Sequence, residues 1–181
     1  QDLGLLQRRR GDGTRVSGVE PFKDNVWHFR FLSSENNTPL RMAETKLKMS
    51  RTSSAGYWSK FLGDEAFYLC ITRKICMLDG TRAAAQMHIP GGLSRDLDDV
   101  DVSELELVNI RLFLESQLNL TINERTNRIS VVTLGETEIK ELGLIGQQPF
   151  YEINATAFTD NKKPAYHQRI LVSISDCNLE F

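Results

Sequence analysis

The alternation of apolar and polar side chains along this chain predicts a structure built mainly from β-strands. A strand buried on one face carries a bulky apolar side chain at every second position, and several segments show this pattern or a short run of β-branched and aromatic residues. The expected strands cover residues 26–32, 44–49, 67–78, 126–134, 149–159 and 165–176, and a further strand returns from the turn at 79–80 to about residue 89.

Short helices are expected between the strands at three places. Residues 53–63 are a helix candidate ended by a glycine, a second helix is expected to run from Ser103 to about Leu118, and a third to end at Gly143. A serine or threonine followed three residues later by glutamate forms a capping box, which satisfies backbone N–H groups at the start of a helix. The expected capping boxes are Ser103 with Glu106 and Thr133 with Glu136.

The same order of elements occurs twice, in residues 61–88 and 141–168. Each copy contains a short helix, a Leu-Gly pair, a strand, a turn that begins with aspartate and a returning strand. Gln86 and His167 each lie seven residues after the aspartate of their turn. A helix–hairpin unit used twice predicts an antiparallel sheet with pseudo-twofold organisation, and therefore the α+β fold class.

Length and charge are those of an ordinary globular protein with one basic corner. The 181 residues suffice for one domain or for a domain with an appendage, and the net charge of −2 gives no overall attraction to nucleic acid. Residues 1–18 hold four arginines and two aspartates, a local charge of +2, so the remainder sits near −4. This asymmetry indicates a basic segment attached to an acidic body.

Cysteine and histidine usage argues against a disulfide framework or a metal centre. Cys70, Cys76 and Cys177 form neither a CxxC pair nor an even set, and the three histidines show no zinc-ligand spacing. No apolar run approaches the ~18–20 residues of a membrane helix, and no signal-peptide pattern is present. We therefore expect reduced thiols, no cofactor, no metal, no membrane partner and a cytoplasmic location.

The basic corner has the pattern of a tight β-hairpin. In GLLQRRRGDGTRV, residues 4–16, two short apolar segments flank three arginines and a Gly-Asp-Gly turn, where glycine allows the backbone angles that a tight turn needs. This segment resembles the wing that ends the winged helix-turn-helix domain of GntR-type bacterial regulators. The residues that fit the wing pattern are Gly4, Leu5, Leu6, Arg8, Arg9, Gly11, Gly13, Thr14 and Val16.

The rest of the chain resembles the effector-binding module of the HutC subfamily of these regulators, called UTRA, which has a chorismate-lyase-like fold. FLGDEAFYLCITRKICMLDG with the later MHIP matches one half of the module, and ELGLIGQQPFYEI with the final hairpin matches the other. The resemblance implies a remnant of the DNA-binding domain at residues 1–18, a linker at 19–25 and a UTRA domain at 26–181.

For the wing, the resemblance implies contacts to the DNA backbone or minor groove. The implied DNA-binding residues are Arg8, Arg9, Arg10, Gly11, Gly13 and Thr14. A wing without its recognition helix cannot read base edges in the major groove, so this chain alone is expected to bind DNA weakly and without sequence preference. The alternative is that the arginines are only a solvated surface run.

Arg73 is the leading candidate for a ligand contact. It interrupts a stripe of apolar residues on alternate positions of the strand 69–77, and a buried guanidinium requires a partner. The partner is either an anionic effector bound in a bidentate manner or an internal carboxylate, unless this face is exposed at a dimer contact. The family resemblance favours the effector, because relatives place a ligand-binding arginine here.

The resemblance adds further candidates for the same effector site. His167 and Arg169 share a face of the last long strand, and His167 aligns with a carboxylate that grips sugar hydroxyls in sugar-phosphate-binding relatives. A second such carboxylate aligns with Ala85, and these departures favour a smaller or less hydroxylated anion. Asn109 and Arg111 fall where relatives carry a ligand-contacting Ser-x-Tyr. The alternatives are an edge-strand surface histidine and a solvated helical arginine.

The resemblance implies a ligand-sensing domain of a transcriptional regulator. Its partners would be a small-molecule effector (a sugar phosphate, a carboxylate or an amino-acid-derived metabolite), operator DNA in the full-length protein, and a second copy in a homodimer. The competing functions are a chorismate-lyase-like enzyme and a plain DNA-binding module. The sequence shows no nucleophile–base constellation, so we expect no enzymatic activity.

Overall fold

A computed structural model describes residues 6–8, 14–16, 30–94, 97, 100–106, 109–118, 121–146 and 149–180 of the chain. The N-terminal hairpin is confirmed within these limits: strands β1 (Leu6–Arg8) and β2 (Thr14–Val16) pair antiparallel, with Arg8 opposite Thr14. The other proposed wing residues, Arg9, Arg10, Gly11 and Gly13, and the linker at 19–25 lie outside the described residues.

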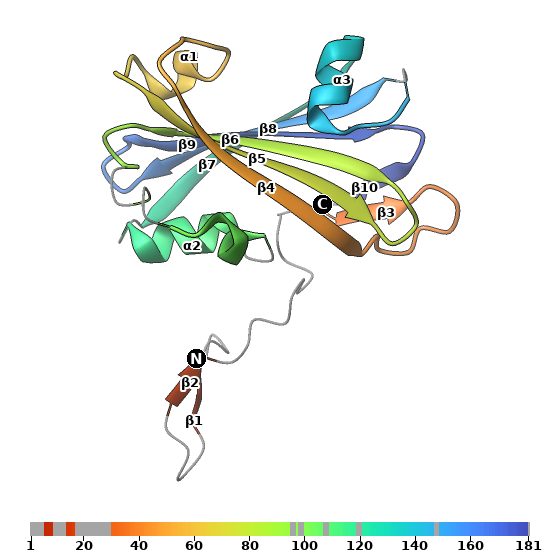
Figure 1. Cartoon of the computed structure of the whole chain (residues 1–181), viewed down its shortest axis with the longest axis horizontal. Helices are drawn as coiled ribbons and strands as arrows, with labels where there is room; N and C mark the ends of the chain where they lie inside the picture. Colours follow the sequence, from red (N-terminus) through yellow and green to blue (C-terminus); the bar gives the residue numbers. More distant parts are fainter. Residues whose placement is uncertain are drawn as a thin grey trace.

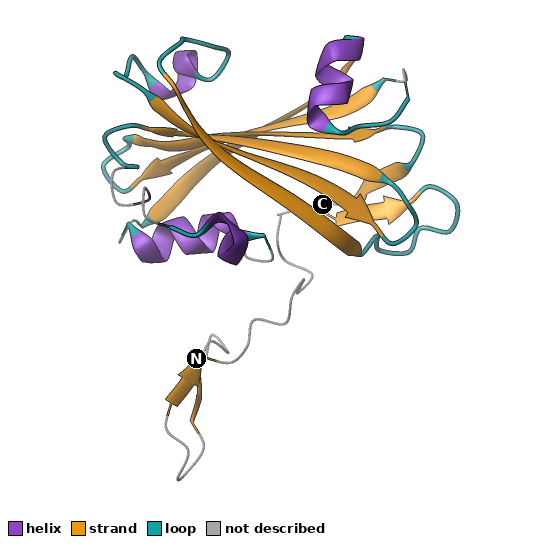
Figure 2. Cartoon of the chain, in the orientation of Figure 1, coloured by secondary structure: helices purple, strands orange, loops and turns teal. Residues whose placement is uncertain are grey.

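A twisted antiparallel sheet of six strands forms the body of the molecule (Figures 1 and 2), which confirms the α+β class. Its strands are β4 (Met42–Thr52), β5 (Tyr68–Met77), β6 (Arg82–Pro90), β7 (Ile122–Val132), β8 (Phe150–Thr159) and β9 (Pro164–Ser173). Their order across the sheet is β4-β5-β6-β9-β8-β7. Each strand pairs antiparallel with its neighbours.

This order has the pseudo-twofold organisation expected from the repeated unit. The hairpins β5–β6 and β8–β9 meet at the centre, where β6 pairs with β9, and β4 and β7 flank them at the two edges. Helix α1 (Ser59–Leu62) precedes the first hairpin, and α3 (Glu136–Leu142) precedes the second. The side chains of the central strands β5, β6 and β9 are mostly buried on both faces of the sheet.

Different elements cover the two faces of the sheet, as Figure 1 shows. One face carries α2 (Ile110–Gln117) and the 3-10 helix η2 (Val102–Leu105), with a small sheet of β3 (Arg30–Ser33) and β10 (Cys177–Glu180). Apolar side chains of β5, β6 and β9 pack against these elements. The opposite face carries α1 and α3, and α3 buries Ile139 and Leu142 against it.

Three helix starts differ from the sequence expectations. The helix expected over 53–63 begins only at Ser59. The helix expected from Ser103 to Leu118 is interrupted: η2 ends at Leu105, and α2 begins at Ile110 with Asn109 as its N-cap, so the Ser103–Glu106 capping box is wrong. The side chains of Arg73 and Thr45 donate hydrogen bonds to the carbonyls of Leu105 and Glu106. In a continuous helix those carbonyls would accept bonds from backbone N–H groups four residues on.

The second capping box, Thr133 with Glu136, is also wrong, because Gly135 is the N-cap of α3 and makes no side-chain capping bond. The expected end of this helix is confirmed: Gly143 has φ +68° and a left-handed conformation that favours glycine. The last strand expected at 165–176 ends earlier, at Ser173, and β10, which begins at Cys177 after a turn, was not expected.

Candidate functional site

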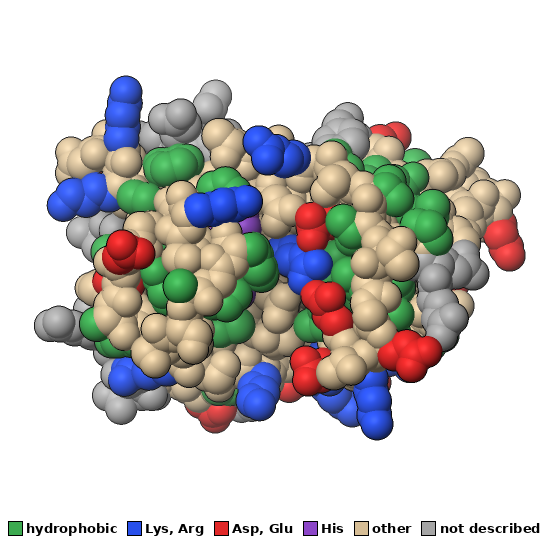
Figure 3. Space-filling model, turned by 90° about the horizontal axis from the view of Figure 1, so that it is seen from above, with side chains coloured by type: hydrophobic (Ala, Val, Ile, Leu, Met, Phe, Trp, Pro, Cys, Tyr) green, Lys and Arg blue, Asp and Glu red, His purple; other side chains and the backbone are tan. Residues whose placement is uncertain are grey.

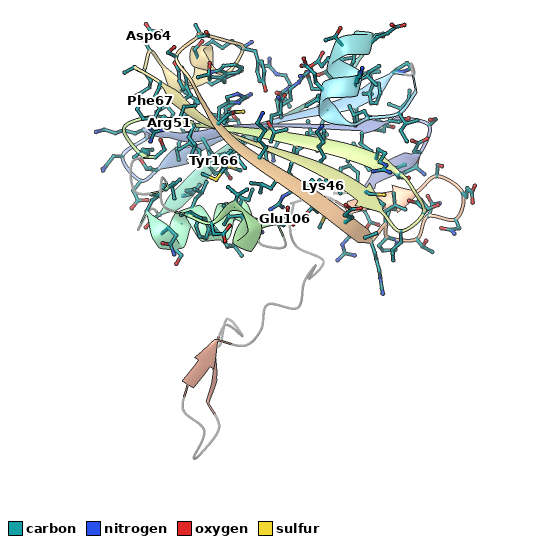
Figure 4. All side chains as sticks on the ribbon, in the orientation of Figure 1. Lys46, Arg51, Asp64, Phe67, Glu106 and Tyr166 are labelled. Atoms are coloured by element: carbon teal, nitrogen blue, oxygen red, sulfur yellow. The ribbon has the colours of Figure 1, made fainter. Side chains whose placement is uncertain are left out.

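Arg73 lies in the middle of β5 on the face covered by α2 and η2. Its side chain is 5% exposed, within the expected apolar stripe, and its Nη2 donates a hydrogen bond of 2.7 Å to the carbonyl oxygen of Leu105. Burial lowers the pKa of Arg73 to about 10, against the opposing effect of the Glu106 carboxylate. Figure 4 labels Glu106 on this side of the sheet. Arg73 is therefore still a cation at neutral pH, in a poorly solvated position.

Three other candidates lie on or beside this face. Ala85 is buried directly opposite Arg73 on β6. Asn109 caps α2, since its side-chain oxygen accepts bonds from the backbone N–H groups of Arg111 and Leu112. The Arg111 side chain forms an ion pair with Glu115 one helical turn later, at 3.1 Å. Asn109 and Arg111 thus have structural roles that the resemblance did not indicate.

His167 and Arg169 lie on the opposite face from Arg73. Residues directly opposite each other on paired strands project to the same face of a sheet. Arg73 pairs with Ala85, and Ala85 pairs with Ile170. Arg169 lies next to Ile170 along β9 and therefore projects to the other side. The six candidate effector residues consequently form two groups separated by the sheet, so one small ligand cannot contact both.

The His167 face contains a groove of about 960 Å³ between α1 and α3, a volume typical of ligand sites. Residues of β6, β7, β8 and β9 form its floor, and residues of α3, of α1 and of the segment just before α1 form its walls. The lining residues used below are Tyr57, Lys60, Phe61, Gln86, Arg128, Ser130, Thr137, Glu138, Glu141, Glu152, Asn154, Thr156, His167 and Arg169.

A network of ion pairs and hydrogen bonds lies at the centre of this groove. Arg169 donates to Glu152 from Nε at 2.6 Å and to Glu138 from Nη1 at 2.5 Å. Glu152 also accepts bonds from Asn154 at 2.9 Å and Ser130 at 3.2 Å. Burial alone would raise the pKa of Glu152, but these donors, led by Arg169, lower it overall. Glu152 is therefore ionised at neutral pH.

Aromatic side chains from the α1 segment cover two histidines at one end of the groove. His167 is 1% exposed and lies on a central strand, so the alternative of a surface histidine on an edge strand is wrong. Phe61 stacks on His167 with ring centroids 4.5 Å apart, and Trp58 stacks on the neighbouring His88 at 3.7 Å. Burial lowers the pKa of both histidines to about 4, so both are neutral at pH 7. Tyr57 lies edge-on to both rings.

Sequence reasoning missed the partners of Arg169. Glu152 and Asn154 are two positions apart on a strand, which indicates a shared polar face and could have marked the floor of the groove. No local signal connects them with Glu138 on α3, because that contact depends on how the helix packs on the sheet. Within the described residues, no group of histidine, cysteine, aspartate and glutamate has the geometry to hold a metal ion. None of the described helices is long and apolar enough to cross a membrane.

Comparison with solved structures reveals the same fold in bacterial regulators. The ligand-binding domain of a protein from Bordetella bronchiseptica, assigned to the GntR family of transcriptional regulators, matches with a TM-score of 0.64 and 15% identity, over 78% of this chain and 95% of that one. PhnF from Mycobacterium smegmatis matches with a TM-score of 0.63 and 15% identity, over 97% of this chain and 76% of PhnF. Its effector domain alone matches with a TM-score of 0.61 and 16% identity, over 75% of this chain and 82% of the domain.

No protein-family model matches the sequence, and no curated protein matches it. At 15–16% identity the structural matches show a shared fold rather than a shared ligand. The chain thus has the fold of the ligand-binding domains of GntR-family transcriptional regulators.

Proposed function

We propose that this chain is the effector-sensing part of a HutC-type GntR regulator, with a UTRA domain at residues 26–181 that controls DNA binding by a winged helix-turn-helix domain. The fold shared with ligand-binding domains of such regulators supports this role. The hairpin formed by β1 and β2 is consistent with a wing. In the full-length regulator, a homodimer in the cytoplasm binds operator DNA, and the effector shifts the balance between two dimer arrangements.

The effector is a small anion that interacts with Arg73. The observation that carries this assignment is a cation only 5% exposed within an apolar stripe of the central sheet. Electrostatic attraction is strong where water is excluded, so an anion reaching this position gains more than it would at the surface. Arg73 also bonds the carbonyl of Leu105, close to the cap of α2 at Asn109. A ligand at Arg73 would therefore act directly on the segment between η2 and α2.

A thermal-shift titration tests the effector assignment. We expect at least one member of a panel of inorganic phosphate, sugar phosphates, organic acids and amino acids to raise the melting temperature of this chain, and Arg73→Ala to abolish the rise. Arg73→Lys keeps the charge but loses the planar two-point geometry, so it should retain only part of the effect. Arg128→Ala, in the groove on the other face, is the matched control and should retain all of it. No shift with any anion would contradict the assignment.

The wing assignment has its own test in the full-length regulator. Arg9→Ala and Arg10→Ala should each weaken operator binding and reduce the dependence of affinity on salt, because each removes a phosphate contact. Unchanged affinity and salt dependence in a fluorescence-anisotropy titration would contradict it. The proposal assigns no catalysis to the chain, in line with the description of its structural neighbours as transcriptional regulators. Formation of product from chorismate would overturn that part.

A further inference from the structure

The floor of the groove between α1 and α3 is a grid of hydrogen-bonding side chains. The register of the sheet places Gln86, Arg169, Asn154 and Arg128 in one row across β6, β9, β8 and β7. Glu152 and Ser130 form a pair in a second row. These groups include short hydroxyl and amide side chains, which both donate and accept hydrogen bonds.

The charges in the groove compensate one another. Arg169, at its centre, is already neutralised by Glu138 and Glu152, which also present their carboxylates to the groove. Lys60, Arg128 and Glu141 lie exposed at the rim. Figure 3 shows acidic and basic side chains together around the centre of this face. Arg169, Lys60 and Arg128 together balance Glu138, Glu152 and Glu141, so the groove as a whole favours neither an anion nor a cation.

At the α1 end of the groove, besides Lys60 at the rim, two uncharged side chains have hydrogen-bonding capacity left over. His167 bonds Thr156 through Nδ1 at 2.9 Å, while its buried Nε2 has no hydrogen-bond partner among the described residues. The buried hydroxyl of Tyr57 also has no hydrogen-bond partner among the described residues. Burial keeps this hydroxyl protonated by raising its pKa, and keeps the His167 ring neutral by lowering the imidazole pKa. A buried polar group without a partner is costly, so this corner favours a ligand with hydroxyl groups.

Phe61 gives the same corner an apolar wall. Its ring stacks on His167, and the ammonium of Lys60 lies over it at 4.8 Å from the centroid. Flat aromatic rings beside polar groups suit a ligand whose C–H bonds and hydroxyls alternate around its surface. An apolar ligand would leave the Tyr57 hydroxyl and the Nε2 of His167 without a hydrogen-bond partner, which is a strong penalty against it.

From these features we propose that the groove between α1 and α3 is a second ligand site, separated by the sheet from Arg73, and that it binds an uncharged polyhydroxylated molecule of the monosaccharide class. The hydroxyls bond Asn154, Ser130, Glu152 and His167, and the C–H faces pack on Phe61. The Arg169 network orients Glu152 and Asn154 before the ligand arrives, which lowers the entropic cost of binding. The domain then binds two ligands, this molecule in the groove and the anion at Arg73.

Ligand-observed NMR on this chain tests the proposal directly. The probes are glucose, galactose, ribose, N-acetylglucosamine, myo-inositol and glycerol at millimolar concentration, with inorganic phosphate, alanine and benzyl alcohol as charged, zwitterionic and apolar comparisons. We expect saturation-transfer signals from at least one sugar or inositol and none from alanine or benzyl alcohol. Phosphate binding, monitored by the thermal shift and its dependence on Arg73, reports on the other face and leaves this result unaffected.

Variants then locate the binding. Thr137→Trp places a large ring in the groove from an exposed position on α3, and Asn154→Leu removes donors from the floor; each should weaken the sugar at least tenfold. Thr133→Trp, an exposed threonine that does not line the groove, and Arg111→Ala on the other face are the matched controls and should bind normally. Circular dichroism verifies that each variant is folded. The proposal is overturned if no uncharged polyol binds, if alanine or benzyl alcohol binds in its place, or if binding survives both groove variants.

Discussion

Removing the positive charge of Arg169 should destabilise the domain substantially. In Arg169→Met an unbranched side chain replaces the stem of the arginine, but Glu138 and Glu152 face each other without the cation that binds both. Breaking a buried ion pair in this way costs about 3–5 kcal/mol. The Arg169 and Glu152 side chains are 12% and 17% exposed, whereas Glu138 is 39% exposed and can turn to water. We therefore expect a loss of about 2–4 kcal/mol at pH 7.

Urea denaturation followed by circular dichroism measures this loss. For a protein of this size it corresponds to a fall in melting temperature of about 4–16 °C. Adding Glu152→Gln to Arg169→Met removes one of the two facing carboxylates and should recover part of the stability. That recovery would show that the cost comes from unpaired charge rather than from lost packing.

The effect should also depend on pH. The pKa of Glu152 in the folded protein is lowered by Arg169, so this pair contributes stability that is present above the unfolded-state pKa of about 4.3 and is lost as pH falls through the folded-state value. The difference between wild type and Arg169→Met should therefore be largest near neutral pH and shrink below about pH 4.3. A difference under ~0.5 kcal/mol at pH 7, within the range of ordinary surface substitutions, or one that is constant with pH, would refute the reasoning.

Substitutions at three further positions test other parts of the structure. Asn109→Ala removes the cap of α2 and should cost about 1 kcal/mol in urea denaturation, whereas Asn109→Asp should be nearly neutral; equal stabilities would contradict the capping role. His167→Phe keeps an aromatic ring against Phe61 but removes a base whose folded pKa is about 4. As the pH falls from 6.5 to 4, the variant should therefore lose less stability than wild type, by at most ~1.4 kcal/mol per pH unit. Parallel pH profiles of unfolding free energy would refute this. Gly143→Ala introduces a Cβ at φ +68° and 3.1 Å from the Lys74 side chain, so it should cost about 1 kcal/mol of stability. A melting temperature as high as that of wild type would contradict this.

Local sequence patterns predicted the elements whose stability depends on nearby residues. The alternating stripe from Leu69 to Met77 identified β5 and placed Arg73 among buried apolar neighbours. The repeated order of elements predicted the paired hairpins and the pseudo-twofold sheet, and Gly143 predicted the end of α3. In each case the information lies within one strand, one turn or one helix end, where backbone geometry depends on adjacent side chains.

The helix start near residue 103 could not be predicted in this way. Ser103 and Glu106 have the spacing of a capping box, but distant side chains decide the conformation there. Arg73 on β5 and Thr45 on β4 bond the carbonyls of Leu105 and Glu106 and compete with helical bonding. Local hydrogen-bond preferences are weak compared with a buried bond to a charged group, so the tertiary contact prevails.

By itself the sequence determined the fold class, the basic hairpin and the individual residues with unusual chemistry: a buried arginine in Arg73 and a polar pair in His167 and Arg169. Only the tertiary structure decided that these residues belong to opposite faces, and that Arg169 is neutralised by Glu138 and Glu152. The physical reason lies in the two-residue period of a strand. The period shows which side chains of one strand share a face, but the faces of different strands are matched only by the hydrogen-bonded register, and a shift of one residue would exchange them.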